Sequence, residues 1–169
     1  MLTLSHVVIR PYAHSDRVWA EGLLNAEFGG PLQCRRGELI DVLALSGLVA
    51  EEDARPLGLL TYQCETGSCE IAFIAAVQRH LGVGSALLDA LREEVADCER
   101  MWLVTTNDNL EALRFYQRRG FVLSALRAGA VDEARRELKP MIGRVGNFGI
   151  PIRDEIELEA RITSRPSAS

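Results

Sequence analysis

The sequence predicts an α/β fold in which helices flank a mixed β-sheet. Residues 69–77 are almost wholly apolar after Glu70, which is typical of a strand buried on both faces in the centre of a sheet. An amphipathic helical pattern follows over residues 82–98, and a second apolar run comes next over residues 101–106. Because a strand reached across a helix lies parallel to the strand before it, these two strands should be parallel.

The remaining elements are expected on both sides of this unit. Runs of β-branched and apolar residues predict further strands, over residues 3–10, 48–52, 57–64, from 121 to 123, and 152–162. Apolar positions at helical spacing predict further helices, over residues 15–25, 38–45, 109–119 and 131–138. Turns at residues 53–56 and 65–68 join the middle strands into a meander.

Local signals set the ends of the first elements. Pro11 closes the first strand, and Ser15 or Asp16 can cap the first helix. Residues 31–37 are expected to be a loop that exposes the double arginine at positions 35–36. The short helix over residues 38–45 would then lead into the meander.

The helix expected over residues 109–119 has the clearest signals at its ends. Asp108 or Asn109 can cap its start, Glu111 stands three residues after Asp108 as in a capping box, and Gly120 ends it. Further on, residues 152–162 alternate apolar and charged side chains. We expect them to form an edge strand whose charges discourage aggregation.

Length and composition bound the class of protein. A chain of 169 residues with 47% hydrophobic and 25% charged residues predicts one globular domain over residues 1–169. Its core is expected over about residues 4–126, followed by a C-terminal extension over 127–163 and a frayed tail over 164–169. The net charge of −5 argues against a nucleic-acid or membrane partner. Without a signal peptide or membrane-spanning run, a cytoplasmic protein is expected.

The cysteines lack the spacing of a metal site. Cys34, Cys64, Cys69 and Cys98 include no paired CxxC motif and no companion histidine cluster, so no metal is expected. Cys64 and Cys69 flank a turn and could face each other across a hairpin. A cytoplasmic protein is expected to keep these thiols reduced.

The turn at residues 82–84 is a candidate anion site. Gly82 and Gly84 let the backbone approach a bulky ligand, and the helix that starts there leaves its first N–H groups without intrahelical partners. These donors lie at the positive end of the helix dipole, which suits a phosphate or pyrophosphate. Glycine pairs of this kind also occur as simple tight turns, so the surrounding motifs have to decide.

Two motifs resemble those of the GNAT family of acyl-CoA-dependent N-acetyltransferases. Residues 79–84, which read RHLGVG, match the family's pyrophosphate motif Gln/Arg-x-x-Gly-x-Gly/Ala. The family's Asn-x-x-Ala, Tyr and Gly-Phe segment is matched at Asn109, Ala112, Tyr116, Gly120 and Phe121. The resemblance covers roughly residues 4–126. It implies a GNAT-like fold, with a central mixed sheet splayed between the two parallel strands.

This resemblance implies acetyl-CoA as the co-substrate, bound between the two parallel strands. The pantetheine arm would pair with the backbone of residues 75–77, and the pyrophosphate would bind the amides of residues 79–85. The link from Val77 to Gly82 is short and lacks the family's proline, which leaves the register of these amides open by a residue. The cofactor-binding residues implied are Ala75, Ala76, Val77, Arg79, Leu81, Gly82, Val83, Gly84, Ser85, Asn109 and Tyr116.

Catalytic roles are also implied by the resemblance. Tyr116 matches the general acid that protonates the departing thiolate, and a core tyrosine is the alternative; a phenol stays protonated at neutral pH. Glu70 matches a catalytic glutamate, and a solvent-exposed carboxylate at a strand end is the alternative. The backbone N–H near Val77 is the implied oxyanion donor. Further candidates for the base are Glu27, Glu51 and Glu155, whereas His80 is expected to face solvent or phosphate.

The implied activity is transfer of an acetyl group to a primary amine of a small molecule, a peptide or a protein, by direct attack. An amine that arrives unprotonated would need no base. If Glu27, Glu70 and Glu155 converge, they would favour a cationic amine. The strand over residues 152–162 could also pair at the edge of a homodimer, or close the acceptor site with residues 153–155.

Two other functions compete with this one. A non-catalytic acyl-CoA sensor or interaction module on the same fold would bind acetyl-CoA without turnover. A dinucleotide-binding domain is disfavoured, because residues 82–84 lack the third glycine of that fingerprint and the upstream strands form a meander rather than repeated βαβ units.

Overall fold

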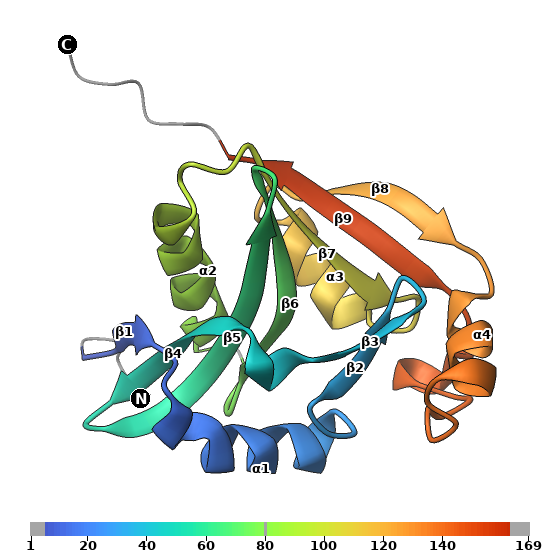
Figure 1. Cartoon of the computed structure of the whole chain (residues 1–169), viewed down its shortest axis with the longest axis horizontal. Helices are drawn as coiled ribbons and strands as arrows, with labels where there is room; N and C mark the ends of the chain where they lie inside the picture. The colour runs from blue at the N-terminus through green and yellow to red at the C-terminus, as the bar shows by residue number, and fades with distance from the viewer. Residues whose placement is uncertain (1–5, 80, 163–169) are drawn as a thin grey trace.

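A seven-stranded mixed sheet, with the strand order β1-β4-β5-β6-β7-β9-β8, organises the protein (Figure 1). The computed structural model describes residues 6–79 and 81–162. The strands are β1 (Val8–Pro11), β2 (Leu32–Arg35), β3 (Glu38–Asp41), β4 (Ser46–Glu52), β5 (Arg55–Glu65), β6 (Ser68–Ala76), β7 (Arg100–Thr106), β8 (Val122–Arg127) and β9 (Glu155–Arg161). The helices are α1 (Arg17–Glu27), α2 (Val83–Glu94), α3 (Leu110–Gln117) and α4 (Ala130–Glu137), with short 3₁₀ turns η1 (His14–Asp16), η2 (Val42–Ala44) and η3 (Asn147–Gly149).

The central strands bury side chains on both faces, because successive residues of a strand point to opposite sides. Leu48 and Leu60 pack with α2 and α3, whereas their neighbours Val49 and Leu59 pack with α1. Helices α2 and α3 therefore cover one face of the sheet, and α1 covers the other (Figure 1). The predicted mixed sheet with flanking helices is confirmed.

Strands β6 and β7 are parallel, as predicted, and they separate toward their C-terminal ends. Their pairing stops at Glu70 and Trp102, whereas β6 continues to Ala76 and β7 to Thr106. The two strands therefore enclose a wedge that opens at their carboxyl ends. Open α/β sheets bind ligands at this kind of position.

The segment between α1 and β4 differs from its prediction. The expected loop over residues 31–37 and helix over residues 38–45 are wrong, because β2 and β3 form a hairpin and only η2 is helical. Arg36 and Gly37 have φ angles of 52° and 76°, and two successive left-handed residues make the tight turn of a hairpin. The expected exposure of Arg35 is also wrong. Its side chain is 13% exposed and pairs with Glu70 on β6.

Strand β9 is an inner strand, which corrects the predicted edge strand. It lies between β7 and β8 and pairs antiparallel with both. On its charged face, Glu157 is buried and its carboxylate accepts a hydrogen bond from Arg127 of β8 at 2.8 Å. The same carboxylate forms an ion pair with the guanidinium of Arg100 on β7 at 3.8 Å. The charges of this strand are therefore paired within the sheet. A core that ended near residue 126 would lack this inner strand.

The ends of the elements agree with the predictions only in part, and the cap of α3 is one of the two residues predicted for it. Asn109 caps α3, because its side-chain oxygen accepts the N–H of Ala112 at 3.2 Å. The carboxylate of Asp16 does not cap α1; it accepts the N–H of Ala13 and two hydrogen bonds from Arg10, each at 2.8 Å. Helix α2 ends at Glu94 rather than near residue 98, and β8 extends to residue 127.

The cysteines are free in the structure, and Cys64 lies opposite Cys69 in the β5-β6 hairpin, as predicted. Within residues 6–79 and 81–162, no group of three or more potential metal-ligating side chains is arranged to hold a metal ion. No helix in these ranges is both long and apolar enough to cross a membrane. The cytoplasmic location and the homodimer stay predictions.

Candidate active site

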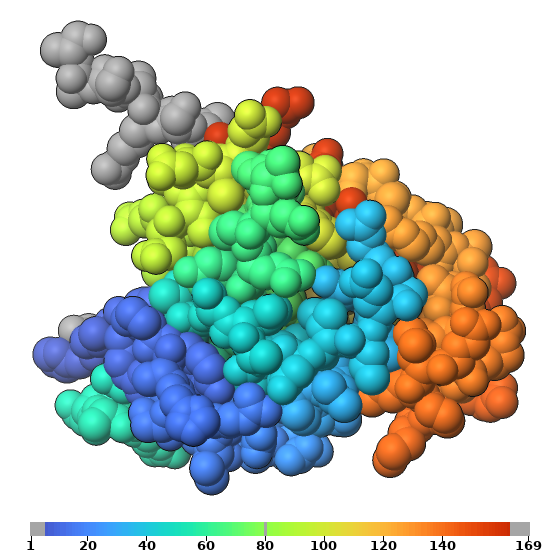
Figure 2. Space-filling model, in the orientation of Figure 1, coloured from blue at the N-terminus to red at the C-terminus, as the bar shows by residue number. Residues whose placement is uncertain are grey.

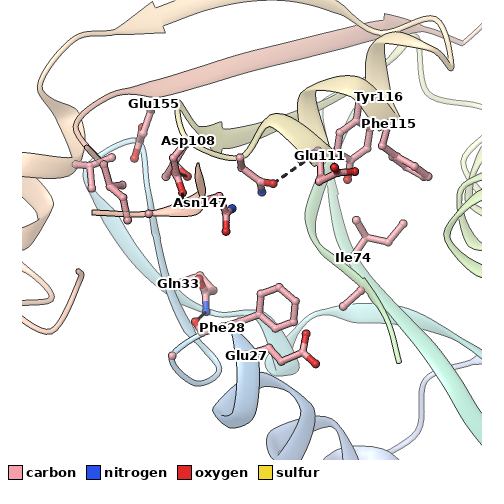
Figure 3. A pocket seen from close by; sticks show the side chains of 18 of the residues that line it. Glu27, Phe28, Gln33, Ile74, Asp108, Glu111, Phe115, Tyr116, Asn147 and Glu155 are labelled. Atoms are coloured by element: carbon pink, nitrogen blue, oxygen red, sulfur yellow. Dashed lines mark hydrogen bonds between the residues drawn. The ribbon is translucent and has the colours of Figure 1, made fainter. Parts of the chain in front are cut away.

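A cavity of about 1080 Å³ lies at the open end of the wedge between β6 and β7. Figure 3 shows Ile74, Phe115 and Tyr116 on one side of it, and Gln33 and Glu155 on the other. We call the first side the α2-α3 end. Its lining residues are Ile74, Ala75 and Ala76 of β6, together with Arg79, Gly84, Ser85 and the lining residues of α3. We call the second side the hairpin end, with the α1-β2 connection, β2 and lining residues between 139 and 155.

The hairpin end brings together segments that are far apart in the sequence. Figure 2 shows the hairpin region, in blue, against the C-terminal segment, in orange. Lys139 donates to the carbonyl oxygens of Gly29 at 3.0 Å and Leu32 at 2.6 Å, and the backbone N–H of Arg36 donates to Glu155 at 3.0 Å. These bonds join the hairpin region to the C-terminal part of the chain at this side of the cavity.

The start of α2 provides backbone donors at the α2-α3 end. Gly82 has a φ of 79° and precedes the helix, so the chain can turn sharply into it. The first intrahelical bond runs from the N–H of Ala86 to the carbonyl of Gly82 at 3.0 Å. The N–H groups of residues 83–85 consequently have no carbonyl of their own helix to bind. Together with the helix dipole they form an anion-binding group.

Arginines surround these donors. Arg119 stacks on the ring of Phe115, with its guanidinium carbon 3.8 Å from the ring centre, and donates to the hydroxyl of Ser85. Phe115 in turn lies close to Gly84, where an added Cβ would stand 3.3 Å from the ring. The glycine therefore allows α2 to pack tightly against α3. Three further arginines line the cavity: Arg79, Arg114 and Arg118.

Most of the residues predicted to bind the cofactor line this cavity. They are Ala75, Ala76, Arg79, Gly84, Ser85, Asn109 and Tyr116. Val77, Leu81, Gly82 and Val83 are not among the lining residues. Val83 is buried in the core instead, and Gly82 contributes the turn. His80 lies outside the described residues.

The backbone at the end of β6 narrows the choice of residue for the oxyanion donor expected near Val77. The N–H of Val77 donates to the carbonyl of Leu57 at 2.8 Å, so it points toward β5 and not into the wedge. Because successive N–H groups of a strand point to opposite sides, the N–H of Ala76 points toward the wedge. The N–H of Ala76 is therefore the candidate oxyanion donor, within the one-residue range expected around Val77.

Tyr116 is both a core tyrosine and a residue of the cavity wall. Its ring packs edge-on against Phe115 and Phe121, with ring centres 5.1 Å apart in both pairs, and the residue is 3% exposed. The same residue lines the cavity. Burial raises the pKa of Tyr116 above its ordinary value of 10. The hydroxyl is therefore a protonated donor at neutral pH.

Glu70 does not lie in this cavity. Its carboxylate is buried and forms a two-point ion pair with Arg35, at 2.6 and 3.0 Å, and accepts a bond from Gln63 at 2.6 Å. It lines a separate cavity of about 210 Å³ next to Trp102. The expected solvent-exposed carboxylate is therefore wrong, and the catalytic role implied for Glu70 stays a prediction for a residue outside the cavity that Tyr116 lines.

Other carboxylates do line the large cavity, namely Glu27, Asp108, Glu111 and Glu155. Glu155 is 3% exposed, and the one described hydrogen bond to its carboxylate is the N–H of Arg36. It stands at the start of β9, opposite Thr106 at the end of β7. Glu51, another candidate, pairs with Arg10 at 2.7 Å and is not a lining residue.

Several lining residues were not anticipated from the sequence. Phe28, Gln33, Asn147 and Lys139 belong to loops and to the hairpin, whose positions depend on contacts across the whole chain. Arg119, Gly143 and Gly146 line the cavity as well, and neither a basic residue near a helix end nor a glycine-rich loop indicates a cavity wall by itself.

Comparisons with known proteins agree with this architecture. The family model described as an acetyltransferase (GNAT) domain matches residues 45–123. The uncharacterized protein YdhI of Bacillus subtilis (strain 168) is 43% identical over 115 residues, which cover 66% of this chain and 71% of that protein.

Solved structures share the fold. A GNAT family acetyltransferase from Elizabethkingia anophelis with acetyl-CoA bound has a TM-score of 0.73 at 17% identity, covering 93% of this chain and 99% of that one. An IAA acetyltransferase from Bacillus cereus ATCC 14579 has a TM-score of 0.70 at 20% identity, covering 92% and 99%. The splayed sheet and the glycine turn thus define an acetyltransferase fold. This chain belongs to the GNAT acetyltransferase family.

Proposed function

We propose that this protein is an N-acetyltransferase that transfers the acetyl group of acetyl-CoA to a primary amine. One observation carries the proposal: a single cavity joins the anion-binding start of α2 to a side lined by carboxylates, with Tyr116 in its wall. A reaction between an anionic co-substrate and an amine needs these two environments side by side.

The residues present fit acetyl-CoA at the α2-α3 end. The free N–H groups of residues 83–85 suit the pyrophosphate, and Arg79 and Arg119 add positive charge around it. The open edge of β6 beyond Glu70 offers backbone groups to the amide-containing pantetheine arm. The side-chain oxygen of Asn109 caps α3, so its side-chain N–H₂ group remains as the donor to the same arm.

The chain's own groups can then carry out acyl transfer. Bound acetyl-CoA supplies an activated acyl carbon as a thioester. The N–H of Ala76 would donate to the acyl oxygen as negative charge develops there. Glu155 would accept a proton from the amine, directly or through water, and Tyr116 would give its proton to the departing sulfur. A C–N bond forms, a C–S bond breaks, and one proton moves from nitrogen while another reaches sulfur.

The carboxylates indicate the type of acceptor. Glu27 and Glu155 line the cavity without an arginine partner among the described residues, whereas Glu70 is already neutralised by Arg35. A protonated amine would therefore be attracted to the hairpin end before it loses its proton. Phe28 beside Glu27 offers an apolar surface to the rest of the acceptor (Figure 3).

A panel of amines tests the proposal. Acetyl-CoA binding is measured by calorimetry, and release of the free thiol is followed with a diamine, a monoamine, a peptide with a free N-terminus and an acidic amino acid. We expect binding, and turnover that is fastest with the cationic amines. Absence of acetyl-CoA binding would contradict the proposal. Binding without turnover by any amine would favour a non-catalytic acyl-CoA sensor.

A further inference from the structure

The turn that joins β7 to α3 makes contacts in two directions. Its last residue, Asn109, caps α3 and lines the cavity next to the other residues of the α2-α3 end. The two residues before it, Asn107 and Asp108, bind the chain on the hairpin side. The segment they bind comprises residues 144–155, which we call the acceptor segment; its lining residues are Gly146, Asn147, Ile152 and Glu155.

Asn107 uses both its backbone and its side chain on this segment. Its backbone N–H donates to the carbonyl of Asp154 at 3.0 Å. Its side-chain oxygen accepts the N–H groups of Arg153 and Asp154, both at 3.0 Å, and its side-chain nitrogen donates to the carbonyl of Pro151 at 2.9 Å. One residue therefore fixes the chain that leads directly into Glu155.

Asp108 holds the other half of the segment. Asp108 is 5% exposed. Its carboxylate accepts hydrogen bonds from the backbone N–H of Asn147 at 3.0 Å and from the hydroxyl of Thr106 at 2.5 Å. The approach is so close that a Cβ on Gly146 would stand 2.0 Å from the carboxylate oxygen and 2.7 Å from the side chain of Ile152. Only glycine at position 146 allows this contact.

We propose that Asn107 and Asp108 are positioning residues for the amine acceptor. They hold the acceptor segment, with Glu155, at a fixed place relative to Asn109 and the cofactor side of the cavity. This inference rests on the proposed function, since it assigns the hairpin end to the amine. It separates two tasks within one turn, because residues 107 and 108 serve the acceptor and residue 109 serves acetyl-CoA.

The separation has a kinetic consequence. Loss of the Asp108 carboxylate removes the bond to Asn147 and leaves the α2-α3 end intact, because no cavity residue of α2 depends on that carboxylate for a described hydrogen bond. We expect Asp108→Ala to raise KM for the best amine of the panel by about tenfold or more. The affinity for acetyl-CoA should stay within about twofold, and kcat should fall together with the amine affinity, because the held segment carries Glu155.

The test combines kinetics with amide hydrogen exchange. Asp108→Ala is compared with Asp41→Ala, whose carboxylate likewise accepts the N–H of a 3₁₀ turn, that of Leu43 at 2.9 Å, but lies outside the cavity. Gly146→Ala disrupts the same contact by adding a Cβ next to the Asp108 carboxylate. It should therefore have the same effects as Asp108→Ala. In both cavity variants, with acetyl-CoA bound, we expect faster exchange in residues 144–154 and unchanged exchange in α2.

Two results would overturn the inference. One is unchanged exchange of residues 144–154 in both Asp108→Ala and Gly146→Ala. The other is an equal loss of amine affinity, kcat and acetyl-CoA affinity, which would show a general structural role. If no amine is a substrate of the wild-type protein, the proposed function fails, whereas the exchange measurement still decides whether Asp108 holds the segment.

Discussion

At the scale of single residues, Tyr116 shows how one side chain meets two demands. Its ring fills the space between Phe115 and Phe121, and its hydroxyl side borders the cavity. The family motif predicts the residue, but only the packing shows why a buried tyrosine can still reach the site. Glu70 is the opposite case. Its strand was predicted correctly, yet the partner that neutralises it, Arg35, comes from a hairpin that local sequence did not predict.

Replacing Tyr116 tests the acid role. Tyr116→Phe should lower kcat by about a hundredfold or more, because general acid catalysis contributes typically 10²–10⁴-fold, and it should leave acetyl-CoA affinity within about twofold. Tyr62→Phe is the matched control, since Tyr62 is half-buried on β5 and outside the cavity. Steady-state kinetics and calorimetry provide both values. Full turnover in Tyr116→Phe would remove the residue from the mechanism.

The pKa of Tyr116 makes a prediction about pH. Burial raises that pKa above 10, so the phenol keeps its proton as the pH rises through its ordinary value. The kcat of the wild-type protein should consequently show no alkaline decline caused by Tyr116 up to about pH 10. A decline near pH 8 or 9, roughly, that disappears in Tyr116→Phe would contradict this expectation.

Asp16 makes a prediction about stability. Arg10 holds the pKa of the Asp16 carboxyl below its ordinary value of 3.8. The ion pair therefore stabilises the folded state at pH values above 3.8. This stabilisation is lost as the pH falls through the lowered pKa. Asp16→Asn should reduce the free energy of unfolding by about 1–3 kcal/mol at pH 7. The difference should shrink below about pH 3. Urea denaturation at both pH values checks this, with the exposed Glu93→Gln as a control; an equal difference at both values would count against it.

At the scale of elements, the tight junction between α2 and α3 sets the shape of the anion site. The glycine turn and the capped α3 follow from local sequence signals, because their determinants are neighbours in the chain. The β2-β3 hairpin does not. Residues 38–45 fit a helical pattern as well as a strand, and the contacts that select the hairpin, such as those of Lys139 with Gly29 and Leu32, come from the opposite end of the chain.

Two glycines allow this junction to be tested. Gly84→Ala places a Cβ 3.3 Å from the Phe115 ring, so it should weaken acetyl-CoA binding by about fivefold or more while the fold is retained. Gly22→Ala meets nothing within 4 Å on α1 and should stabilise the protein by about 0.5–1 kcal/mol without changing binding. Calorimetry and thermal unfolding distinguish the two. Equal effects of both substitutions on binding would contradict the assignment.

At the scale of the whole molecule, β9 connects the two halves of the site. It lies between β7 and β8, and its first residue, Glu155, is part of the cavity wall. The sequence pattern predicts a strand here, because apolar and charged residues alternate. It does not predict where the strand pairs, since that depends on partners about 30 to 60 residues away, such as Arg127 and Arg100.

Truncation tests the role of β9. A chain that ends at Arg127 lacks the strand between β7 and β8, so β8 would lose its partner and β7 would expose an apolar edge. We expect this chain to show no cooperative thermal unfolding by circular dichroism, whereas the full-length chain should unfold in one transition. A cooperative transition in the truncated chain would mean that residues 6–127 form a sufficient core.

One measurement tests most directly whether a single cavity brings acetyl-CoA and an amine together. It is the rate of thiol release from acetyl-CoA with each amine of the panel, compared between the wild-type protein and Tyr116→Phe. We predict that thiol release depends on both the protein and the amine, is fastest for cationic amines, and falls by about a hundredfold in Tyr116→Phe. Wild-type protein that binds acetyl-CoA but releases no thiol above background with any amine would contradict it.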